Sequence, residues 1–351
     1  MRKFSFSDFK EFLGGLGDLG TFIPIFVALV ALNGLNPVLI LLSAGILYIT
    51  CGLYYKLPIP VQPLKAMAAL AIALGLGKEY IQSAGIIIGL ILLVISLTNI
   101  TKFLPRVFTA PIIKGMQLGV GLMLIRISLV MIFNPHNSGA HVLPALPFNL
   151  FDFRNVNLSL PSLEVFSRAF WILVLPQLPL TLGNAIVGTC DIAKINFAER
   201  AKKVTERSLC LDLGIANTFL GLFGGYMPLC HGSSGLTAHI SFGARTGKAT
   251  IMAGIMFLLS GLIWGNQAGV VFRMIPHSIL GVMLCYVGFR HAALIRDLKG
   301  KKGFLLAAVI GVIGLFTNNL TFALLLGIII WHTPQLVSNL LHRLRNQTVS
   351  Q

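Results

Sequence analysis

One short segment places a cation where a helix must break. In PIPVQPLKAMAA, residues 58–69, three prolines precede Lys65 inside an apolar region. Proline is well tolerated at the first helical position, so the spacing predicts a helix that begins at Pro63, with Gln62 as its N-cap and Lys65 in its first turn. A helix N-terminus carries about half a positive charge, so a lysine does not stabilise the helix there. The extra charge and the unpaired backbone N–H groups would instead suit an anion.

A second segment, CHGSSG at residues 230–235, offers matching groups. Gly232 permits close backbone approach, Ser233 and Ser234 provide hydroxyl donors, and His231 could add a further charge. Two facing helix starts together with Lys65 would form a pocket for a small oxyanion. The alternative is that Lys65 extends its ammonium to water and that the serines only cap a helix.

The composition indicates the kind of element that positions these groups. Of 351 residues, 56% are hydrophobic and only 11% are charged, whereas soluble domains carry about 25% charged residues. The mean hydropathy is +0.85, and apolar runs of the roughly 20 residues needed to cross a bilayer recur along the chain. The sequence therefore predicts an all-α polytopic membrane protein, embedded in the lipid bilayer and without an evident signal peptide.

Several apolar segments are expected to cross or enter the membrane, five of them before the expected loop at 134–165 and seven after it. They are 13–33, 36–55, a short 61–76, 81–100, 110–133, 166–190, 208–225, a short 229–242, 249–266, 270–289, 303–317 and 319–341.

The basic residues predict the orientation of these spans. With a cytoplasmic N-terminus, most of the 27 Lys and Arg residues fall inside, as the positive-inside rule requires, and the C-terminus is cytoplasmic as well. This assignment holds only if 58–63 and 226–230 are non-helical breaks near the midplane, which is tolerated where the chain lines a protein-buried or watery cavity. Topology thus explains the net charge of +16, and no nucleic-acid partner is expected.

The two breaks indicate an inverted repeat. GGLGDLGTFIPIF precedes the first and PQLPLTLGNAIVG the second, and such paired Pro/Gly-interrupted segments are typical of half-helices that meet at a midplane site. The first short segment would run outward and the second inward. We expect residues 1–133 to form a shortened first repeat, 134–165 an external loop that replaces two helices, 166–341 the second repeat and 342–351 a cytoplasmic tail.

Five segments carry a family resemblance. They are GDLGTFIP, PIPVQPLKAMAA, PQLPLTLGNAI, MPLCHGSSGLTAHISFGARTG and IPHSILGVMLCYVGF. The sequence resembles the molybdate transporter family, distant relatives of the SulP sulfate permeases. The resemblance implies the fold shared by SulP and nucleobase permeases, in which a core domain moves against a gate domain, and no STAS domain is expected.

Other polar residues at membrane depth have competing interpretations. Asp18 is an acid inside the first span and could couple protons or orient the substrate, or it could be the N-cap of a helix that starts near Leu19. Thr21, in the same segment, is a further candidate for substrate binding. Asp191 and Asp212 are expected near the cytoplasmic ends of their spans.

Three more polar residues lie in apolar segments. Arg126 could serve in helix packing or in a gate ion pair, with a partner that the sequence does not show. Asn184 and Thr181 could face the site or hold helices together. The five cysteines show no metal-ligand spacing, and no cofactor or metal is expected.

These features favour a secondary active transporter for a tetrahedral oxyanion, most consistent with proton-coupled molybdate uptake across the cell membrane. A sulfate transporter and a passive anion channel of the same fold are alternatives. A membrane enzyme is disfavoured, because no nucleophile is paired with a base in any recognisable motif. A homodimer is a further expectation.

Overall fold

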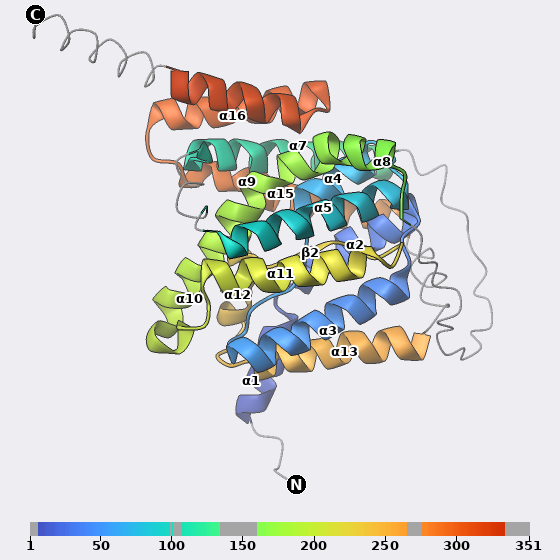
Figure 1. The fold of residues 1–351 in the computed structure, drawn as a ribbon, viewed down its shortest axis with the longest axis vertical. Coiled ribbons are helices and arrows are strands. Elements are labelled where there is room, and N and C mark those ends of the chain that lie inside the picture. The colour runs from blue at the N-terminus through green and yellow to red at the C-terminus, as the bar shows by residue number, and fades with distance from the viewer. Residues whose placement is uncertain (1–5, 99, 101–106, 134–159, 265–275, 334–351) are drawn as a thin grey trace, which may run out of the picture.

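The computed structural model describes residues 6–98, 100, 107–133, 160–264 and 276–333 (Figure 1). In the first half the helices are α1 Phe6–Leu16, α2 Leu19–Asn33, α3 Pro37–Tyr55, α4 Lys65–Ala73, α5 Lys78–Leu97 and α7 Ala110–Phe133. The second half contains α8 Leu163–Ala169, η4 Phe170–Val174, α9 Leu175–Leu180, η5 Thr181–Gly188, α10 Thr189–Phe197, η6 Ala198–Ala201, α11 Glu206–Gly221, α12 Ser233–Ser241, α13 Lys248–Trp264, α15 His277–Ala292, η8 Ala293–Asp297 and α16 Lys301–Thr317. A last apolar helix spans Leu320–Thr333.

The helices are those of a multi-pass membrane protein. Among the described residues, five helical stretches are long and apolar enough to cross a membrane, or six if α1 and α2, bent by 42°, count as one span. The expected loop at 134–165 lies almost wholly outside the described residues, and the expected tail at 342–351 lies outside them completely.

The span predicted at 166–190 is longer in the structure. A continuous helical stretch of 39 residues runs from Leu163 to Ala201. Proline interrupts the regular hydrogen-bond ladder of a helix, and Pro176 and Pro179 lie in α9, between the π-helical segments η4 and η5. The chain passes these prolines by widening its turns, so the helix does not end near residue 190.

Two short strands pair with each other at the centre of the molecule, and we call them the crossed strands because they come from opposite halves of the chain. Strand β1 (Gln62–Pro63) pairs antiparallel with β2 (Leu229–Cys230), with Gln62 opposite Cys230 and Pro63 opposite Leu229. The predicted helix start at Pro63 was therefore wrong: α4 begins at Lys65 and its N-cap is Leu64. The cause is non-local, because pairing with β2 keeps Gln62 and Pro63 extended.

Side chains of neighbouring helices satisfy the backbone groups that the breaks leave open. Asn217 on α11 donates to the Leu229 carbonyl at 2.7 Å and accepts the Leu229 N–H at 2.9 Å. On the other side, the Gln177 Oε1 atom accepts the N–H of Met67, in the first turn of α4, at 3.0 Å. Buried backbone groups need such partners, so these amides allow non-helical chain inside the protein.

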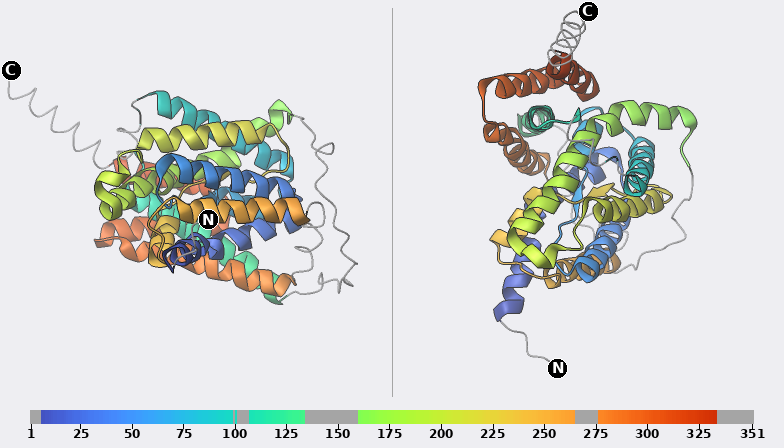
Figure 2. Two further views of the ribbon diagram at one scale, coloured as in Figure 1. Left: turned by 90° about the horizontal axis from the view of Figure 1, so that it is seen from below. Right: turned by 60° about the vertical axis from the view of Figure 1, so that its left-hand side comes forward.

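The two halves are built alike and face each other. Helices α4 and α12 are both nine residues long, and each follows one of the two antiparallel strands, so the helices start from opposite directions. Beside them α15 and α16 pack on α7, and Figure 2 shows these orange, red and teal helices together on one side. The remaining spans enclose the crossed strands.

Candidate functional site

Lys65 opens α4 and points at the start of α12. Its ammonium Nζ donates to Ser234 Oγ at 3.3 Å, and among the described residues no carboxylate lies within ion-pair distance of it. Lys65 is only 6% exposed, whereas Ser234 is exposed. This burial argues against an ammonium that extends to bulk water. The charge is held where the N-termini of two helices meet.

Asp18 lies in the bend between α1 and α2 and contacts the first crossing strand. Its Oδ2 atom accepts a hydrogen bond from Gln62 Nε2 at 2.5 Å. Asp18 occupies the N-cap position of α2, but its side chain makes no capping hydrogen bond. The second amide atom, Gln62 Oε1, is buried and has no hydrogen-bond partner among the described residues.

Two glycines let α12 approach this pair. A Cβ atom on Gly232 would overlap Gln62 Oε1, and one on Gly235 would lie 2.5 Å from Gln62 Nε2 and 2.7 Å from Asp18 Oδ2. Real Cβ atoms do not come so close to polar atoms. The close approach expected of Gly232 is therefore made to the Gln62 amide.

Ser233 is fixed by the second half of the molecule. Its hydroxyl donates to Asn184 Oδ1 at 2.6 Å, and Asn184 lies in the π-helical segment η5. Thr181, in the same segment, accepts from Gln177 Nε2 at 3.1 Å and so helps to hold the amide that caps α4. Thr21 is half-buried in the first turn of α2, and its backbone N–H donates to the Asp18 carbonyl at 3.0 Å.

His231 belongs to a separate cluster with Asp212 and Tyr55, and it makes no hydrogen bond to the lysine or the two serines described above. Its Nδ1–H donates to the Pro60 carbonyl at 2.7 Å, and its Nε2 lies 3.2 Å from Asp212 Oδ1. Tyr55 donates its hydroxyl proton to Asp212 Oδ2 at 2.5 Å. Asp212 lies in the interior of α11, which begins at Glu206, so the expected place of Asp212 at the end of this span was wrong. With both ring nitrogens engaged, His231 is removed from the groups free to meet an anion.

The same cluster contains residues of the types that bind metal ions. Cys51, Asp212 and His231 each offer one ligand atom, and these three atoms lie within 4.8 Å of one another. Sequence spacing did not indicate this group, because its members come from three separate segments. An acid and a histidine inside apolar segments were the only signal.

Arg126, whose partner the sequence did not show, binds the end of α16. Its Nη2 donates to Asn318 Oδ1 at 2.5 Å and its Nη1 to the Leu315 carbonyl at 3.5 Å. Asn318 is the left-handed C-cap of α16. Among the described residues Arg126 thus satisfies a helix terminus and makes no ion pair.

Comparisons with known proteins show the family to which the chain belongs. The sequence model of a family described as "Molybdate transporter of MFS superfamily" matches residues 10–124 and 169–290. The chain is 24% identical to molybdate transporter 2 of Arabidopsis thaliana, over 92% of this chain and 86% of that protein. It is 27% identical to molybdate transporter 1 of the same plant, over 84% and 81% of the two chains.

A solved structure with a similar fold is the transmembrane domain of a cyanobacterial bicarbonate transporter, BicA. Its TM-score is 0.63 at 14% sequence identity, over 90% of this chain and 96% of that domain. The predicted all-α polytopic membrane fold is confirmed.

Proposed function

The chain belongs to the molybdate transporter family, and from this we propose that it moves molybdate across the membrane as a secondary active transporter, with the oxyanion held between the starts of α4 and α12. The carrying observation is Lys65, a buried cation with a hydroxyl as its hydrogen-bond partner and no carboxylate partner among the described residues. Asp18 is near enough to interact electrostatically with Lys65 but lies outside ion-pair distance, and a buried charge without a close counter-charge is costly. A bound dianion would supply that counter-charge.

Each group then has a distinct task. Backbone N–H groups at the two helix starts and the Lys65 ammonium would face the tetrahedral dianion. The exposed Ser234 hydroxyl would donate a hydrogen bond to one oxygen. Ser233 would act as a positioning residue, because Asn184 already accepts its proton. Thr21, in the first turn of α2, would contribute from the third helix start at the site.

Asp18 and Gln62 would couple the anion to a proton. An ionised Asp18 accepts the Gln62 N–H, which leaves Gln62 Oε1 directed at Gly232. A protonated Asp18 can itself donate, so rotation of the amide would pair Oε1 with Asp18 and turn the N–H groups toward the start of α12. Protonation would thus exchange an acceptor for a donor beside the anion.

Coupling to a cation is required by the energetics of uptake. Moving a dianion into a compartment at negative potential costs roughly 4.6 kcal/mol per 100 mV, twice the value for one charge. Asp18→Asn should retain exchange of oxyanion across the membrane and lose proton-driven accumulation, whereas the exposed Asp297→Asn should lose neither. Accumulation that remains sensitive to a protonophore in Asp18→Asn would place the coupling group elsewhere.

The test of the transport function is uptake of labelled molybdate into proteoliposomes, with and without an inward proton gradient. Uphill accumulation that a protonophore abolishes is the expected result, and tungstate should compete because it is also a tetrahedral dianion. Equal competition by sulfate would favour the sulfate alternative. Uptake that only follows the electrochemical gradient would favour a channel. The transporter family argues against the enzyme alternative.

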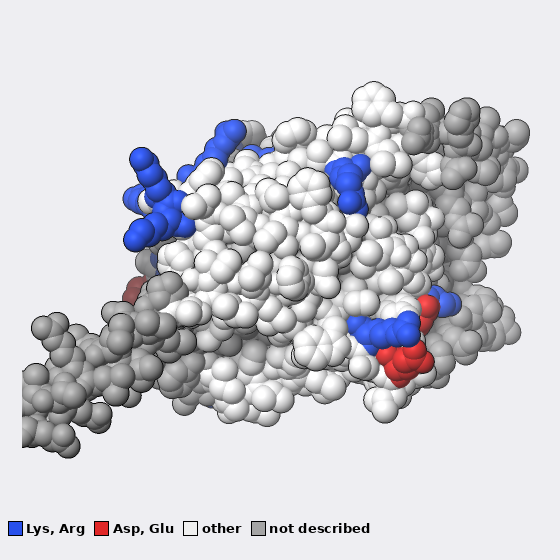
Figure 3. All heavy atoms as spheres, turned by 90° about the horizontal axis from the view of Figure 1, so that it is seen from above, with Lys and Arg blue, Asp and Glu red and all other residues white. Residues whose placement is uncertain are grey.

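We further propose a cytoplasmic N-terminus, a location in the cell membrane, assembly as a homodimer, and division of the chain into a shortened repeat at 1–133 and a full repeat at 166–341. Figure 3 shows a group of Lys and Arg at one end of this face, fewer basic residues elsewhere on it and a broad uncharged surface between them, and this group supports the orientation. The six described helices before the undescribed segment 134–159 and the longer second half support the division.

A further inference from the structure

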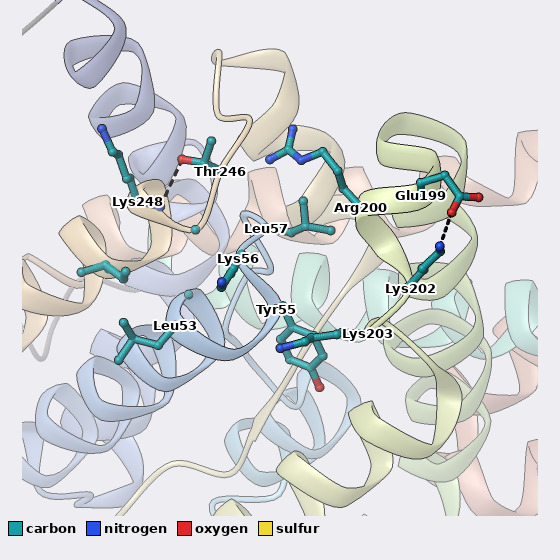
Figure 4. A pocket seen from close by; sticks show the side chains of 13 residues that line it. Leu53, Tyr55, Lys56, Leu57, Glu199, Arg200, Lys202, Lys203, Thr246 and Lys248 are labelled. Atoms are coloured by element: carbon teal, nitrogen blue, oxygen red, sulfur yellow. Dashed lines mark hydrogen bonds and ion pairs between the residues drawn. The ribbon is translucent and has the colours of Figure 1, made fainter.

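A cavity lies away from the paired strands β1 and β2, where the end of α3, the segment η6 and the start of α13 meet (Figure 4). Its volume is about 700 Å³, within the range of about 300 to 1,000 Å³ typical of small-molecule sites. We call it the basic pocket and define it by the apolar residues Leu53, Leu57 and Ile251 and the cations Lys56, Arg200 and Lys203. It is lined by none of the groups assigned above to the transport site.

The charge of the basic pocket is not compensated from within. Five lining side chains are cationic and one, Glu199, is acidic. Glu199 pairs with Lys202 at 2.5 Å, and Lys248 pairs with Asp8 at 2.7 Å. The Lys56 ammonium has no hydrogen-bond or ion-pair partner in the part of the chain that the structure describes.

The other two cations of the pocket have only neutral partners. Arg200 donates from Nη2 to the Arg245 carbonyl at 2.9 Å, and the Nζ atom of Lys203 lies 5.1 Å from the centre of the Tyr54 ring. Lys56, Arg200 and Lys203 therefore converge on one cavity without a carboxylate to balance them.

The backbone on both sides of the pocket is strained. Lys56 has φ 56° and Ala198 has φ 45°, and among the described residues Asn318 is the only other non-glycine residue with positive φ. L-residues avoid this region, and a helix that ends as α3 does normally carries glycine or asparagine there. Strained backbone tends to persist at functional sites. Here it places the cation of Lys56 at the cavity.

The pocket also opens toward the surface that lipid would cover. Leu53 is 62% exposed and its neighbour Tyr54 is 52% exposed, both on the spanning helix α3. An inorganic anion would satisfy the cations and leave the Leu57 and Ile251 wall without a partner. An amphipathic anion would satisfy both.

We propose that the basic pocket binds the phosphate headgroup of an anionic phospholipid, with Lys56, Arg200 and Lys203 at the phosphate and Leu53 beside the acyl chain. Basic pockets between helices at the membrane surface bind such headgroups in other membrane proteins. Leu57 is buried in the pocket wall and begins the segment that leads to β1. A bound lipid would therefore hold the base of the first crossing strand.

The test is native mass spectrometry of the full chain in detergent with added phosphatidylglycerol, and phosphatidylcholine as the neutral comparison. The variant Lys56→Gly with Arg200→Gln should bind phosphatidylglycerol about a hundredfold more weakly than the wild type, as the loss of two charge-assisted contacts predicts. The control variant Lys301→Gln with Lys302→Gln removes the same charge from exposed positions on α16 and should bind as the wild type does.

Folding failure can be separated from loss of binding. Glycine suits φ 56°, so Lys56→Gly alone should unfold at a temperature no lower than the wild type while it binds less phosphatidylglycerol. If the pocket variant and the control variant lost the same amount of bound phosphatidylglycerol, the pocket cations would have no specific role in lipid binding. That result would overturn the proposal. Displacement of the lipid by millimolar inorganic phosphate would also overturn it, because the ligand would then be a free anion.

Discussion

The two breaks at the centre of the molecule share one backbone design and differ in their side chains. Each consists of a two-residue strand followed by a nine-residue helix, and the strands pair with each other. The first break carries a full charge, Lys65, and an amide tied to an acid. The second carries hydroxyls, while His231, between its strand and its helix, is directed away to Asp212. A symmetric scaffold thus supports an asymmetric site, with charge on one side and neutral donors on the other.

The breaks also differ in how firmly they are held. Asn217 satisfies both the N–H and the carbonyl of Leu229 in the second, whereas Gln177 satisfies one N–H, that of Met67, in the first. The second break should therefore be the more rigid of the two. If so, the first break would be the part that responds to protonation of Asp18.

The largest effect expected is on stability. Asn217→Ala would leave two buried backbone groups of Leu229 unpaired, at about 1 to 3 kcal/mol each, so the free energy of unfolding should fall by about 2 to 6 kcal/mol. Gln177→Ala would leave the Met67 N–H unpaired and should lower it by about 1 to 3 kcal/mol. Chemical unfolding in detergent micelles measures both.

The control for this pair is Asn196→Ala. Asn196 is exposed and donates one hydrogen bond to the Ile192 carbonyl within its own helix, at 2.9 Å, so its replacement should change stability little. A variant at Asn217 as stable as this control would show that the breaks do not depend on side-chain amides.

The next effect concerns the charged side of the site. Lys65→Ala should weaken molybdate binding by about ten- to a hundredfold, the equivalent of a charge-assisted contact of roughly 1.5 to 3 kcal/mol. Lys65→Arg should recover little, because a planar guanidinium does not replace a compact ammonium in a buried space. Isothermal titration with molybdate measures both, and the exposed Lys78→Ala serves as control. Wild-type affinity in Lys65→Ala would remove Lys65 from the site.

Much of this arrangement could be predicted from sequence, because its signals are local. Three prolines at 58–63, and Pro228 with the neighbouring Gly224 and Gly225, predicted the breaks, and the apolar runs predicted the helices around them. The helix start at Lys65 could not be predicted, since it depends on pairing between strands more than 160 residues apart. For the same reason the sequence placed Asp18 at a helix start and could not show its contact with Gln62.

The cluster of His231, Asp212 and Tyr55 was missed for a related reason. A histidine next to glycine and serine suggests a ligand site, and nothing in the local sequence shows that an acid on another helix already engages its ring. The contacts of α11 with β2 decide this, and they follow from packing. Sequence patterns therefore indicated where the site lies, but they did not show which of its residues are free to bind an anion.

The smallest effect expected lies on the neutral side of the site. Ser234→Ala removes one hydroxyl donor and should weaken molybdate binding by about two- to tenfold, as a neutral hydrogen bond of about 0.5 to 1.5 kcal/mol predicts. Ser241, also exposed, lies at the far end of the same helix and donates to the Thr237 carbonyl at 2.8 Å, so Ser241→Ala should leave the affinity unchanged.

The double variant of Ser234 and Lys65 sharpens the comparison between the two breaks. The two side chains are in contact at 3.3 Å, and residues in contact do not contribute additively. If both hold the same oxyanion, Ser234→Ala should cost less affinity in the Lys65→Ala background than in the wild type, because the anion is already poorly held. Strict additivity would mean that the hydroxyl and the ammonium act on separate ligands, and the two breaks would then not form one site.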